Sequence, residues 1–493
     1  MDVSRGSALA LLGVGLFVVT MVVGAATAPS GSAGGVDAPA TPSPDDTDAP
    51  SDPGATPAPS EPQTLVGNQG GWVTHGSVVA FDGRSVAWRN TQADGYFEVS
   101  RLEDGRVLAA FANESADDCG ELSAPCARTG YRVVEPGSGE IVSEYSFPVG
   151  SITNSEVHAA DATGDGGIVY VDMDAERVVL VENDTEVWEW HASDFYEAPP
   201  DPASRDWLHI NDVDTIGDGR FLVSVRNANQ LVVVERGEGV VEVVNEDDGT
   251  SDANCLKSGR LYDADGDGDV RCGDPSVIKE QHNPQWLGDG AVLVADSEND
   301  RVVELHRTEN GSWEPVWAVD RAGGIALTWP RDADRLPDGD TLIADSRNRR
   351  VIEVNPQGEM VWNVSVGAAA KHGPGIVYEA DRLPYGEYAG SYDGGSTGAD
   401  GNGTVAGGAS ATPTKTPLPR MTAANGSGAL TAPDDGIPLL SEGVAGLQGT
   451  FAWVPIWFGE LHLAATALGL LFVLVGGVDH LLAARGVSLP GRE

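Results

Sequence analysis

Two stretches of the sequence decide the fold: HNPQWLGDGAVLVADSENDRVVEL at residues 282–305 and RDADRLPDGDTLIADSRNRRVIEV at residues 331–354. Each begins with a His or an Arg and runs through a short segment to an Asp-Gly turn. Each ends in two apolar segments joined by an Asn-containing turn. Short runs of alternating apolar residues separated by turn residues indicate antiparallel strands. The pair therefore predicts an all-β repeat.

Further copies of this pattern begin at Tyr96, His158 and His209, and a partial copy covers residues 73–88. The starts at 158 and 209 are 51 positions apart, and those at 282 and 331 are 49 apart. A fourth apolar segment that often ends in Trp completes several copies. Repeats of three or four strands at this spacing are typical of propeller blades. We therefore predict a six-bladed β-propeller.

The residues that open the repeats are expected to meet at the centre of the propeller. In this fold the first strand of each blade lines the central channel, so equivalent positions converge on one ring. His158, His209, His282 and Arg331 occupy that position. Polar residues that simply fill an aqueous channel are the plainer explanation for any one of them. Three His at the same repeat position favour a functional site, with Arg331 as a channel residue of unassigned role.

The ends of the chain predict a membrane tether around one folded domain. Residues 8–28 and 451–478 are largely apolar, and residues 29–63 and 390–450 have the compositions of disordered linkers. No Lys or Arg lies between Arg5 and Arg84 or between Arg420 and Arg485, which favours an extracytoplasmic propeller at the cell membrane. The expected segments are a signal peptide or N-terminal anchor (1–28), a linker (29–63), the propeller (64–389, with an insertion at 245–280), a second linker (390–450), a transmembrane helix (451–480) and a cytoplasmic tail (481–493).

Composition excludes one class of partner. The chain has 30 Lys and Arg against 75 Asp and Glu, for a formal net charge of -45. A surface of this charge repels nucleic acid. The carboxylates are spread between apolar segments, which favours a hydrated folded surface suited to high salt, as in a halophile; an ordinary acidic secreted protein is the alternative.

The four cysteines fit an oxidising compartment. Cys119 and Cys126 are close in sequence, as are Cys255 and Cys272, and neither pair has the CxxC spacing or the neighbouring His of a metal site. We predict two disulfides, Cys119 with Cys126 and Cys255 with Cys272. Free thiols or a metal site are the alternatives.

The insertion contains a calcium-loop motif. Acidic residues occupy positions 1, 3, 5, 7 and 12 of a twelve-residue loop, with Gly268 at position 6. The position-12 residue is Asp instead of the usual Glu, and no flanking helices are evident. A structural calcium ion is expected here, with a solvated acidic loop as the alternative. The candidate ligands are Asp263, Asp265, Asp267, Asp269 and Asp274.

Three local sequences carry a resemblance to a known family. They are DWLHINDVD (206–214), SVRNANQ (224–230) and QHNPQW (281–286). Together they resemble the arylsulfotransferase family, whose members move a sulfuryl group between phenols within a six-bladed propeller. The resemblance covers most of residues 155–365.

The resemblance implies a role for each polar residue. It makes His282 the nucleophile that becomes transiently sulfated, and His158 the group that exchanges the phenolic proton. It also implies that His209, Asn211 and Arg226 hold the sulfuryl oxygens. The implied substrates are an aryl sulfate donor and a phenolic acceptor, with no cofactor for catalysis.

The sequence also departs from the family. The stretch before the first repeat is too short for the N-terminal β-domain of bacterial members, and the predicted C-terminal span is an addition. The usual His-His-Asp start is replaced by Val157-His158-Ala159. The alternatives are a non-catalytic extracellular propeller that binds a surface glycan or a protein partner, and a lyase or hydrolase on the same scaffold.

Overall fold

The computed structural model describes residues 63–70, 75–152, 154–202, 206–217, 219–246, 255–288, 290–366 and 375–386. All of them belong to one compact unit, Ser60–Ala432. The predicted segments 1–28, 390–450, 451–480 and 481–493 lie outside the described residues. Within the described ranges, none of the helices has the length and apolar character needed to cross a bilayer.

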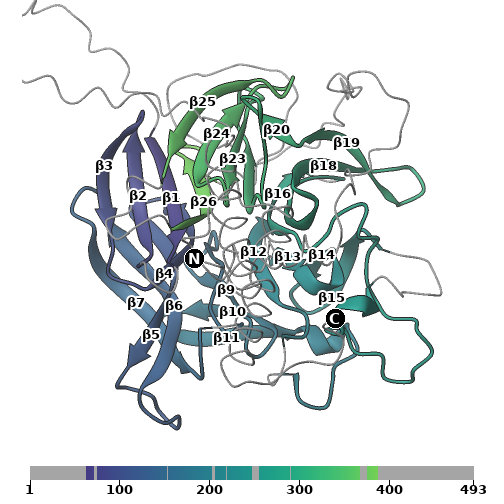
Figure 1. Ribbon diagram of the computed structural model, residues 1–493. Helices are drawn as coiled ribbons and strands as arrows, with labels where there is room; N and C mark the ends of the chain where they lie inside the picture. Colours follow the sequence, from purple (N-terminus) through teal and green to yellow (C-terminus); the bar gives the residue numbers. More distant parts are fainter. Residues whose placement is uncertain are drawn as a thin grey trace, which may run out of the picture. The chain divides into compact units, whose positions relative to one another are not determined.

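The described residues form six four-stranded antiparallel sheets, which confirms the predicted all-β, six-bladed propeller (Figure 1). Blades are numbered here by their order along the chain. Blade 1 contains β26 (Ile376–Arg382), β1 (Gln63–Gln69), β2 (Ser77–Asp82) and β3 (Ser85–Asn90). Blade 2 contains β4 (Gly95–Arg101), β5 (Val107–Ala116), β6 (Cys126–Glu135) and β7 (Glu140–Val149). Blade 3 contains β8 (Ala160–Ala162), β9 (Ile168–Asp172), β10 (Arg177–Glu182) and β11 (Thr185–His191).

The other three blades follow the same order, from the innermost strand outward. Blade 4 contains β12 (Ile210–Gly217), β13 (Arg220–Val225), β14 (Gln230–Glu235) and β15 (Gly239–Val244). Blade 5 contains β16 (His282–Gly288), β17 (Ala291–Asp296), β18 (Arg301–Arg307) and β19 (Trp313–Val319). Blade 6 contains β22 (Asp332–Arg335), β23 (Thr341–Asp345), β24 (Arg350–Val354) and β25 (Met360–Ser365).

Short elements connect the blades. A two-stranded ribbon, β20 (Arg321–Ala322) with β21 (Ile325–Ala326), precedes blade 6. The helical segments of the described chain are single 3-10 turns: η1 (Ala192–Asp194), η3 (Arg226–Ala228), η4 (Leu256–Ser258) and η5 (Ser297–Asn299).

The ring is closed by a strand from the far end of the domain. β26 pairs antiparallel with β1, in a register that sets Leu65 opposite Asp381. β26 also contacts β4 of blade 2 and β22 of blade 6, so it is the innermost strand of blade 1. Closure by β26 leaves no exposed sheet edge at the junction of the two ends.

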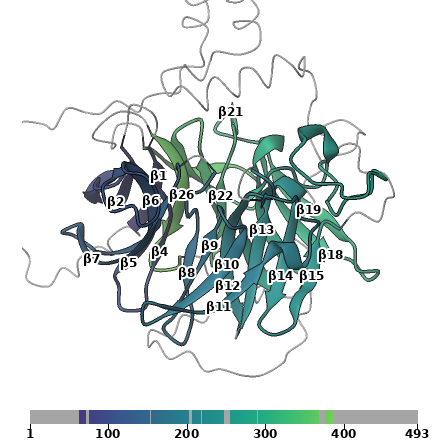
Figure 2. The same cartoon turned by 90° about the horizontal axis from the view of Figure 1, so that it is seen from below.

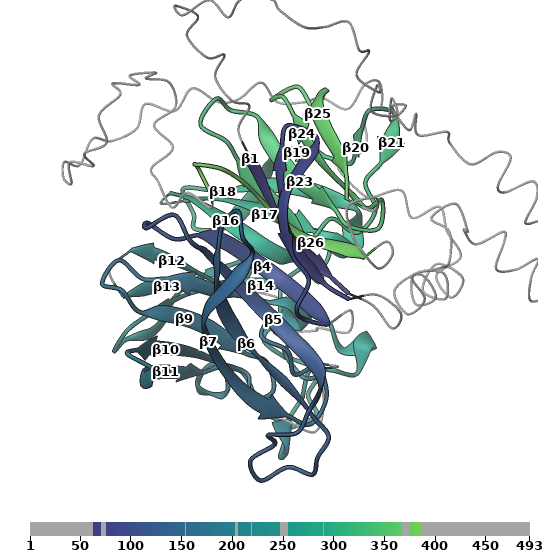
Figure 3. The ribbon, with the colours of Figure 1, turned by 90° about the vertical axis from the view of Figure 1, so that its left-hand side faces the viewer.

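Apolar packing between blades forms the core. Six hydrophobic clusters are present, and each one joins two consecutive blades around the ring. In the cluster between blades 3 and 4, for example, Val169 and Val178 pack with Phe221 and Val223. Figures 2 and 3 show these two blades as neighbours, in agreement with the contacts between β9 and β12. The alternating pattern read from the sequence therefore marks two faces that are both buried against neighbouring blades.

Polar side chains of the inner strands link each blade to the next. Six hydrogen bonds join a side chain of one blade to the backbone of the following one, with donor-to-acceptor distances of 2.7 to 3.0 Å. In five of them a side-chain oxygen accepts from a backbone N–H, and in the sixth an amide donates to a carbonyl. The side chains, from blade 1 to blade 6, are Glu379, Glu98, Asp161, Asn211, Gln285 and Asp332.

Both predicted disulfides are present. Cys119–Cys126 closes the loop between β5 and β6. Cys255–Cys272 lies in the long connection from β15 to β16, where it holds the insertion together. Bridges in loops of this kind restrict the unfolded chain and stabilise the folded one.

A first prediction concerns the closure of the ring. A chain that ends at residue 374 lacks β26, so β1 loses its partner and the interfaces of blade 1 with blades 2 and 6 lose an inner strand. We expect this truncation to abolish the cooperative unfolding transition. The measurement is urea unfolding followed by tryptophan fluorescence.

The matched control is a chain that ends at residue 389, which keeps β26. It should unfold at the same urea concentration as the full-length protein. A cooperative transition in the shorter chain would show that blade 1 does not need its C-terminal strand.

Candidate functional site

One side chain from each blade meets at the centre of the propeller. Neighbouring ring centroids lie 4.7 to 6.0 Å apart, and the Arg331 Cζ lies 5.0 Å from the centroid of the Tyr378 ring. The structure thus brings together all four residues that the repeat positions placed in the channel, and adds two aromatic residues. The six, from blade 1 to blade 6, are Tyr378, Phe97, His158, His209, His282 and Arg331.

His282 is held in one tautomer by its neighbour Ser297. Its Nδ1 lies 2.9 Å from Ser297 Oγ, and that hydroxyl also lies 2.7 Å from the carbonyl oxygen of Pro330. A carbonyl only accepts, so the hydroxyl proton goes to Pro330 and Nδ1–H must donate to Oγ. Nε2 therefore carries the lone pair, and no described residue hydrogen-bonds to it.

The surroundings of His282 keep it neutral. It is 2% exposed. Burial lowers the pKa of its imidazole well below the usual value, and the positive charges of Arg331 and Arg226 act in the same direction. A neutral imidazole with a free nitrogen is a nucleophile.

The backbone at His209 is unusual. His209 has φ of 55°, a left-handed conformation that is costly for a residue with a Cβ. The carboxylate of Glu176 in blade 3 accepts hydrogen bonds from the backbone N–H groups of Leu208, His209 and Ile210 at 2.7, 2.7 and 3.0 Å. These three bonds hold the turn that aims His209 into the channel.

The side chain of His209 is paired with a carboxylate. Nδ1 lies 2.6 Å from Oδ1 of Asp206. The pKa of His209 is lowered to about 4, chiefly by burial and also by the charge of Arg226, while Asp206 opposes both. His209 is therefore neutral at pH 7.

His158 lies deeper among aromatic rings. Its ring centroid is 4.7 Å from that of Phe97 and 5.2 Å from that of Tyr378. Both ring nitrogens are buried without a hydrogen-bond partner, and Nε2 lies 3.5 Å from Oε1 of Glu156. Burial lowers the pKa of His158, although the Glu156 carboxylate acts in the opposite direction.

Arg331 lies over an indole. Its Cζ is 3.8 Å from the Trp329 ring centroid, and the same ring lies 4.2 Å from Cζ of Arg347. Arg331 donates from Nη1 to Gln69 Oε1, and among the described residues no carboxylate lies within ion-pair distance of it. Burial lowers its pKa to about 9, so it is still charged at pH 7. Such a buried cation suits an anionic ligand.

Arg226 belongs to a network that reaches into the insertion. It lies at the start of η3, one residue beyond β13, and pairs with Glu280. Glu280 also lies 3.5 Å from Nη1 of Arg260, and Nε of Arg260 lies 3.5 Å from Asp206. The insertion therefore contributes a cation to the edge of the site.

Asn211 lies at the interface of blades 4 and 5. His209 precedes β12 and has positive φ, so strand alternation does not fix the side on which its side chain lies relative to that of Asn211. The Asn211 amide donates to the carbonyl of Gln281 at 2.8 Å. Its observed contact joins blades 4 and 5.

A spacing in the sequence could have placed the two aromatic residues, Phe97 and Tyr378, in the ring. His158, His282 and Arg331 each stand seven positions before the Asp of an Asp-Gly turn. Phe97 has the same spacing to Asp104-Gly105, and Tyr378 to Tyr385-Gly386. Asp206 and Arg260 had no such signal, because they lie outside the repeat.

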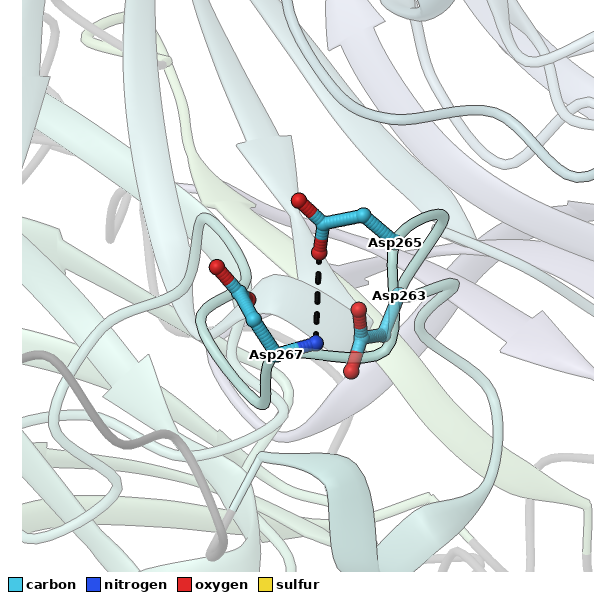
Figure 4. A group of neighbouring side chains, drawn as sticks. All are labelled: Asp263, Asp265 and Asp267. Carbon is cyan, nitrogen blue, oxygen red and sulfur yellow. Dashed lines mark hydrogen bonds between the residues drawn. The ribbon is translucent and has the colours of Figure 1, made fainter.

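Three of the five residues predicted to bind calcium form a cluster. One carboxylate oxygen from each of Asp263, Asp265 and Asp267 lies within 4.8 Å of the others. Figure 4 shows the three side chains around one loop, where Asp265 accepts a hydrogen bond from the backbone of Asp267 at 3.2 Å. Asp269 and Asp274 are not part of this group; Asp274 accepts a hydrogen bond from the backbone of Ser276.

Comparison with known proteins gives one family match. Residues 141–367 match the arylsulfotransferase (ASST) family, which confirms the resemblance found in the sequence. The matched region runs from within β7 to just beyond β25, so it contains the three histidines and Arg331. The comparison with curated proteins gives no match.

Several solved structures are similar to this chain at low identity. A Bacteroides caccae protein of unknown function is 13% identical, covering 65% of this chain and 98% of that one, with a TM-score of 0.43. The periplasmic gluconolactonase PpgL of Pseudomonas aeruginosa is 14% identical, covering 64% and 99%, with a TM-score of 0.38. Selenomethionine-substituted virginiamycin B lyase of Staphylococcus aureus is 12% identical, covering 54% and 69%, with a TM-score of 0.32.

A second prediction follows from the neutral histidines. Unfolded His has a pKa near 6.5, whereas folded His209 has a pKa of about 4. Between these two pH values the unfolded chain therefore binds more protons than the folded one. The contribution of His209 to stability is therefore complete above pH 6.5 and is lost as the pH falls toward 4. The total loss is on the order of 3 kcal/mol, since one pKa unit is about 1.4 kcal/mol.

The measurement compares the free energy of unfolding at pH 7 and pH 5 in the wild type and in His209→Asn. Asn tolerates the left-handed backbone. The variant should lose less stability than the wild type between these two values, and His191→Asn, which changes an exposed histidine, should lose as much as the wild type. Equal slopes in all three proteins would contradict the assignment.

Proposed function

We propose that this chain, whose residues 141–367 match the arylsulfotransferase family, moves a sulfuryl group from a phenolic sulfate ester to a phenolic acceptor through a sulfated His282. The observation that carries the proposal is the state of His282. Its Nδ1 proton is committed to Ser297, its Nε2 holds a lone pair, and two buried arginines lie near it. A propeller that only binds a glycan has no need of this arrangement.

In the first half of the reaction, Nε2 of His282 attacks the sulfur of the donor ester. The sulfur–oxygen ester bond breaks, and its electron pair leaves on the phenolic oxygen. Arg226 and Arg331 lie near the imidazole and stabilise negative charge on the sulfuryl oxygens. Removal of one such group commonly slows a reaction about a hundredfold to a thousandfold.

In the second half, the acceptor phenol attacks the same sulfur, and the electron pair of the sulfur–nitrogen bond returns to Nε2. One pocket thus serves donor and acceptor in turn, as expected for a covalent intermediate. Ser297 keeps Nδ1–H in place throughout, because its own proton stays on the Pro330 carbonyl. His282 is regenerated in its starting tautomer.

The proposed setting is the outer face of a membrane. The two disulfides are supporting evidence, since they persist in an oxidising compartment. The apolar segments at residues 8–28 and 451–478 would tether the propeller. The high density of acidic residues would suit a salt-rich medium.

The insertion is proposed to hold a structural calcium ion. The Asp263, Asp265 and Asp267 side chains offer oxygen ligands on a loop with the spacing of a calcium motif. The Cys255–Cys272 bridge encloses this loop. An ion there would fix the segment that carries Arg260 to the edge of the site.

A third prediction tests the transfer. The purified protein in high salt is mixed with 4-nitrophenyl sulfate and a phenol, and release of nitrophenol is followed. Without the acceptor, the wild type should gain the mass of one sulfuryl group on the peptide that contains His282. His282→Ala should gain none, and its turnover should fall about a thousandfold or more, because it lacks the nucleophile.

His191→Ala is the control, because His191 is 42% exposed and remote in sequence from the ring residues. It should transfer sulfate at the wild-type rate. Equal activity in the wild type and His282→Ala, or a wild type that is inactive with every aryl sulfate supplied, would sink the proposal.

A fourth prediction tests the ion. Chelation of calcium should lower the melting temperature of the wild type, because an ion that binds only the folded state stabilises it. Asp263→Asn should melt lower than the wild type in calcium and should not respond to the chelator. An unchanged melting temperature in the wild type after chelation would count against a bound ion.

A further inference from the structure

The pair formed by Asp206 and His209 has the form of an acid–base dyad. His209 Nδ1 and Asp206 Oδ1 are 2.6 Å apart. Burial by itself would raise the pKa of Asp206, but the hydrogen bond from His209 and nearby positive charges lower it to about 2. Asp206 is therefore an acceptor only, and the proton on the imidazole is on Nδ1. Nε2 of His209 carries the lone pair.

A neutral His209 of this tautomer cannot donate to a sulfuryl oxygen. Its Nε2 accepts hydrogen bonds, and a sulfuryl oxygen has no proton to give. Nε2 can take the proton of a phenol, and the imidazolium that forms is stabilised by the Asp206 carboxylate. The geometry thus supports a role in proton exchange.

The fold supports this position more than any other in the ring. His209 adopts a strained left-handed backbone, which three hydrogen bonds to the buried Glu176 carboxylate hold in place. Arg260 from the insertion lies 3.5 Å from the other oxygen of Asp206. A strained backbone conformation that neighbouring groups stabilise in this way is typical of functional sites.

His158, the alternative, has a weaker carboxylate contact. Both of its nitrogens are sealed from solvent and make no hydrogen bond, and the nearest carboxylate oxygen, Glu156 Oε1, lies 3.5 Å from Nε2, against 2.6 Å between His209 Nδ1 and Asp206 Oδ1. Its ring packs between Phe97 and Tyr378 and lies 5.6 Å from the ring of His209. It forms the wall behind His209.

We propose that the Asp206–His209 pair takes the proton of the acceptor phenol, with Asp206 as the positioning residue and His158 as a packing residue. This inference rests on the proposed sulfuryl transfer through His282. In the acceptor half, the phenol proton moves to His209 Nε2 while the phenolic oxygen attacks sulfur and the sulfur–nitrogen bond breaks. In the donor half, Nε2 of His209 has no proton to give, so the phenolic oxygen leaves as a phenolate and takes its proton from water; the His209 imidazolium left by each acceptor half returns its proton to water.

The test uses enzyme already sulfated on His282 and a series of acceptor phenols that differ in acidity. At pH 7 an acidic fluorinated phenol is already ionised, whereas an alkylphenol must lose its proton. Asp206→Asn should therefore pass the sulfuryl group to the most acidic acceptor within about fivefold of the wild-type rate. With the least acidic acceptor it should be slower by about a hundredfold or more, the usual size of general base catalysis. The readout is the loss of the sulfuryl mass from His282 in a single turnover, followed by intact mass.

His209→Gly provides a second variant, because glycine adopts the left-handed backbone without strain. It should show the same selective loss, and imidazole added to the buffer should restore part of the rate with weakly acidic acceptors only. His158→Gln is the matched control, and its dependence on acceptor acidity should follow that of the wild type.

The outcomes separate the two proposals. If wild-type His282 is never sulfated, the proposed function itself fails. If His282 is sulfated but Asp206→Asn slows transfer to all acceptors equally, or if His158→Gln shows the selective loss, the function stands and the dyad is wrong.

Discussion

The structure depends on the hydrogen bonds that join each inner strand to the next blade. Each of the six blade interfaces has one, and in five of them a side-chain oxygen accepts from a backbone N–H. The carboxylates of Glu98, Asp332 and Glu379 that take part are 0 to 2% exposed. Buried groups of this kind are costly unless paired, so the bonds fix the relative position of neighbouring inner strands. The channel residues occupy the starts of these same strands, so their spacing is set by the same contacts.

Much of this arrangement could be predicted because the repeat is visible in the sequence. The distance from a channel residue to its Asp-Gly turn is constant in four blades, which was enough to place His158, His282 and Arg331 on one ring. A further copy of the pattern begins within β26, with Tyr in place of Asp at the turn: YEADRLPYG at residues 378–386 corresponds to RDADRLPDG at residues 331–339. The channel position is aromatic in blades 1 and 2, whereas it is His or Arg in the other four, so residue type alone does not reveal this copy. Ring closure by β26 is the physical reason for that copy.

The chemistry of the site was less predictable than its location. Sequence spacing placed His209 in the channel but could not show its positive φ, which depends on three bonds to Glu176 in another blade. Asp206 precedes the repeat, and Arg260 lies in the insertion, so periodicity does not reach either residue. Asp206 decides the tautomer of His209, and Arg260 contacts Asp206. The residues that line a propeller channel can thus be read from a repeat, while their protonation depends on irregular segments around it.

Cations lie beside the histidines although the chain as a whole is strongly acidic. The chain has a formal net charge of -45, yet Arg226 and Arg331 lie near His282, and among the described residues no carboxylate lies within ion-pair distance of Arg331. An anionic ester approaching such a protein is repelled at long range in dilute buffer. Salt at 1 M shortens the Debye length to about 3 Å, which removes the repulsion of the surface but hardly weakens buried charges. A high-salt medium would therefore leave Arg331 able to attract an anionic substrate that enters the channel.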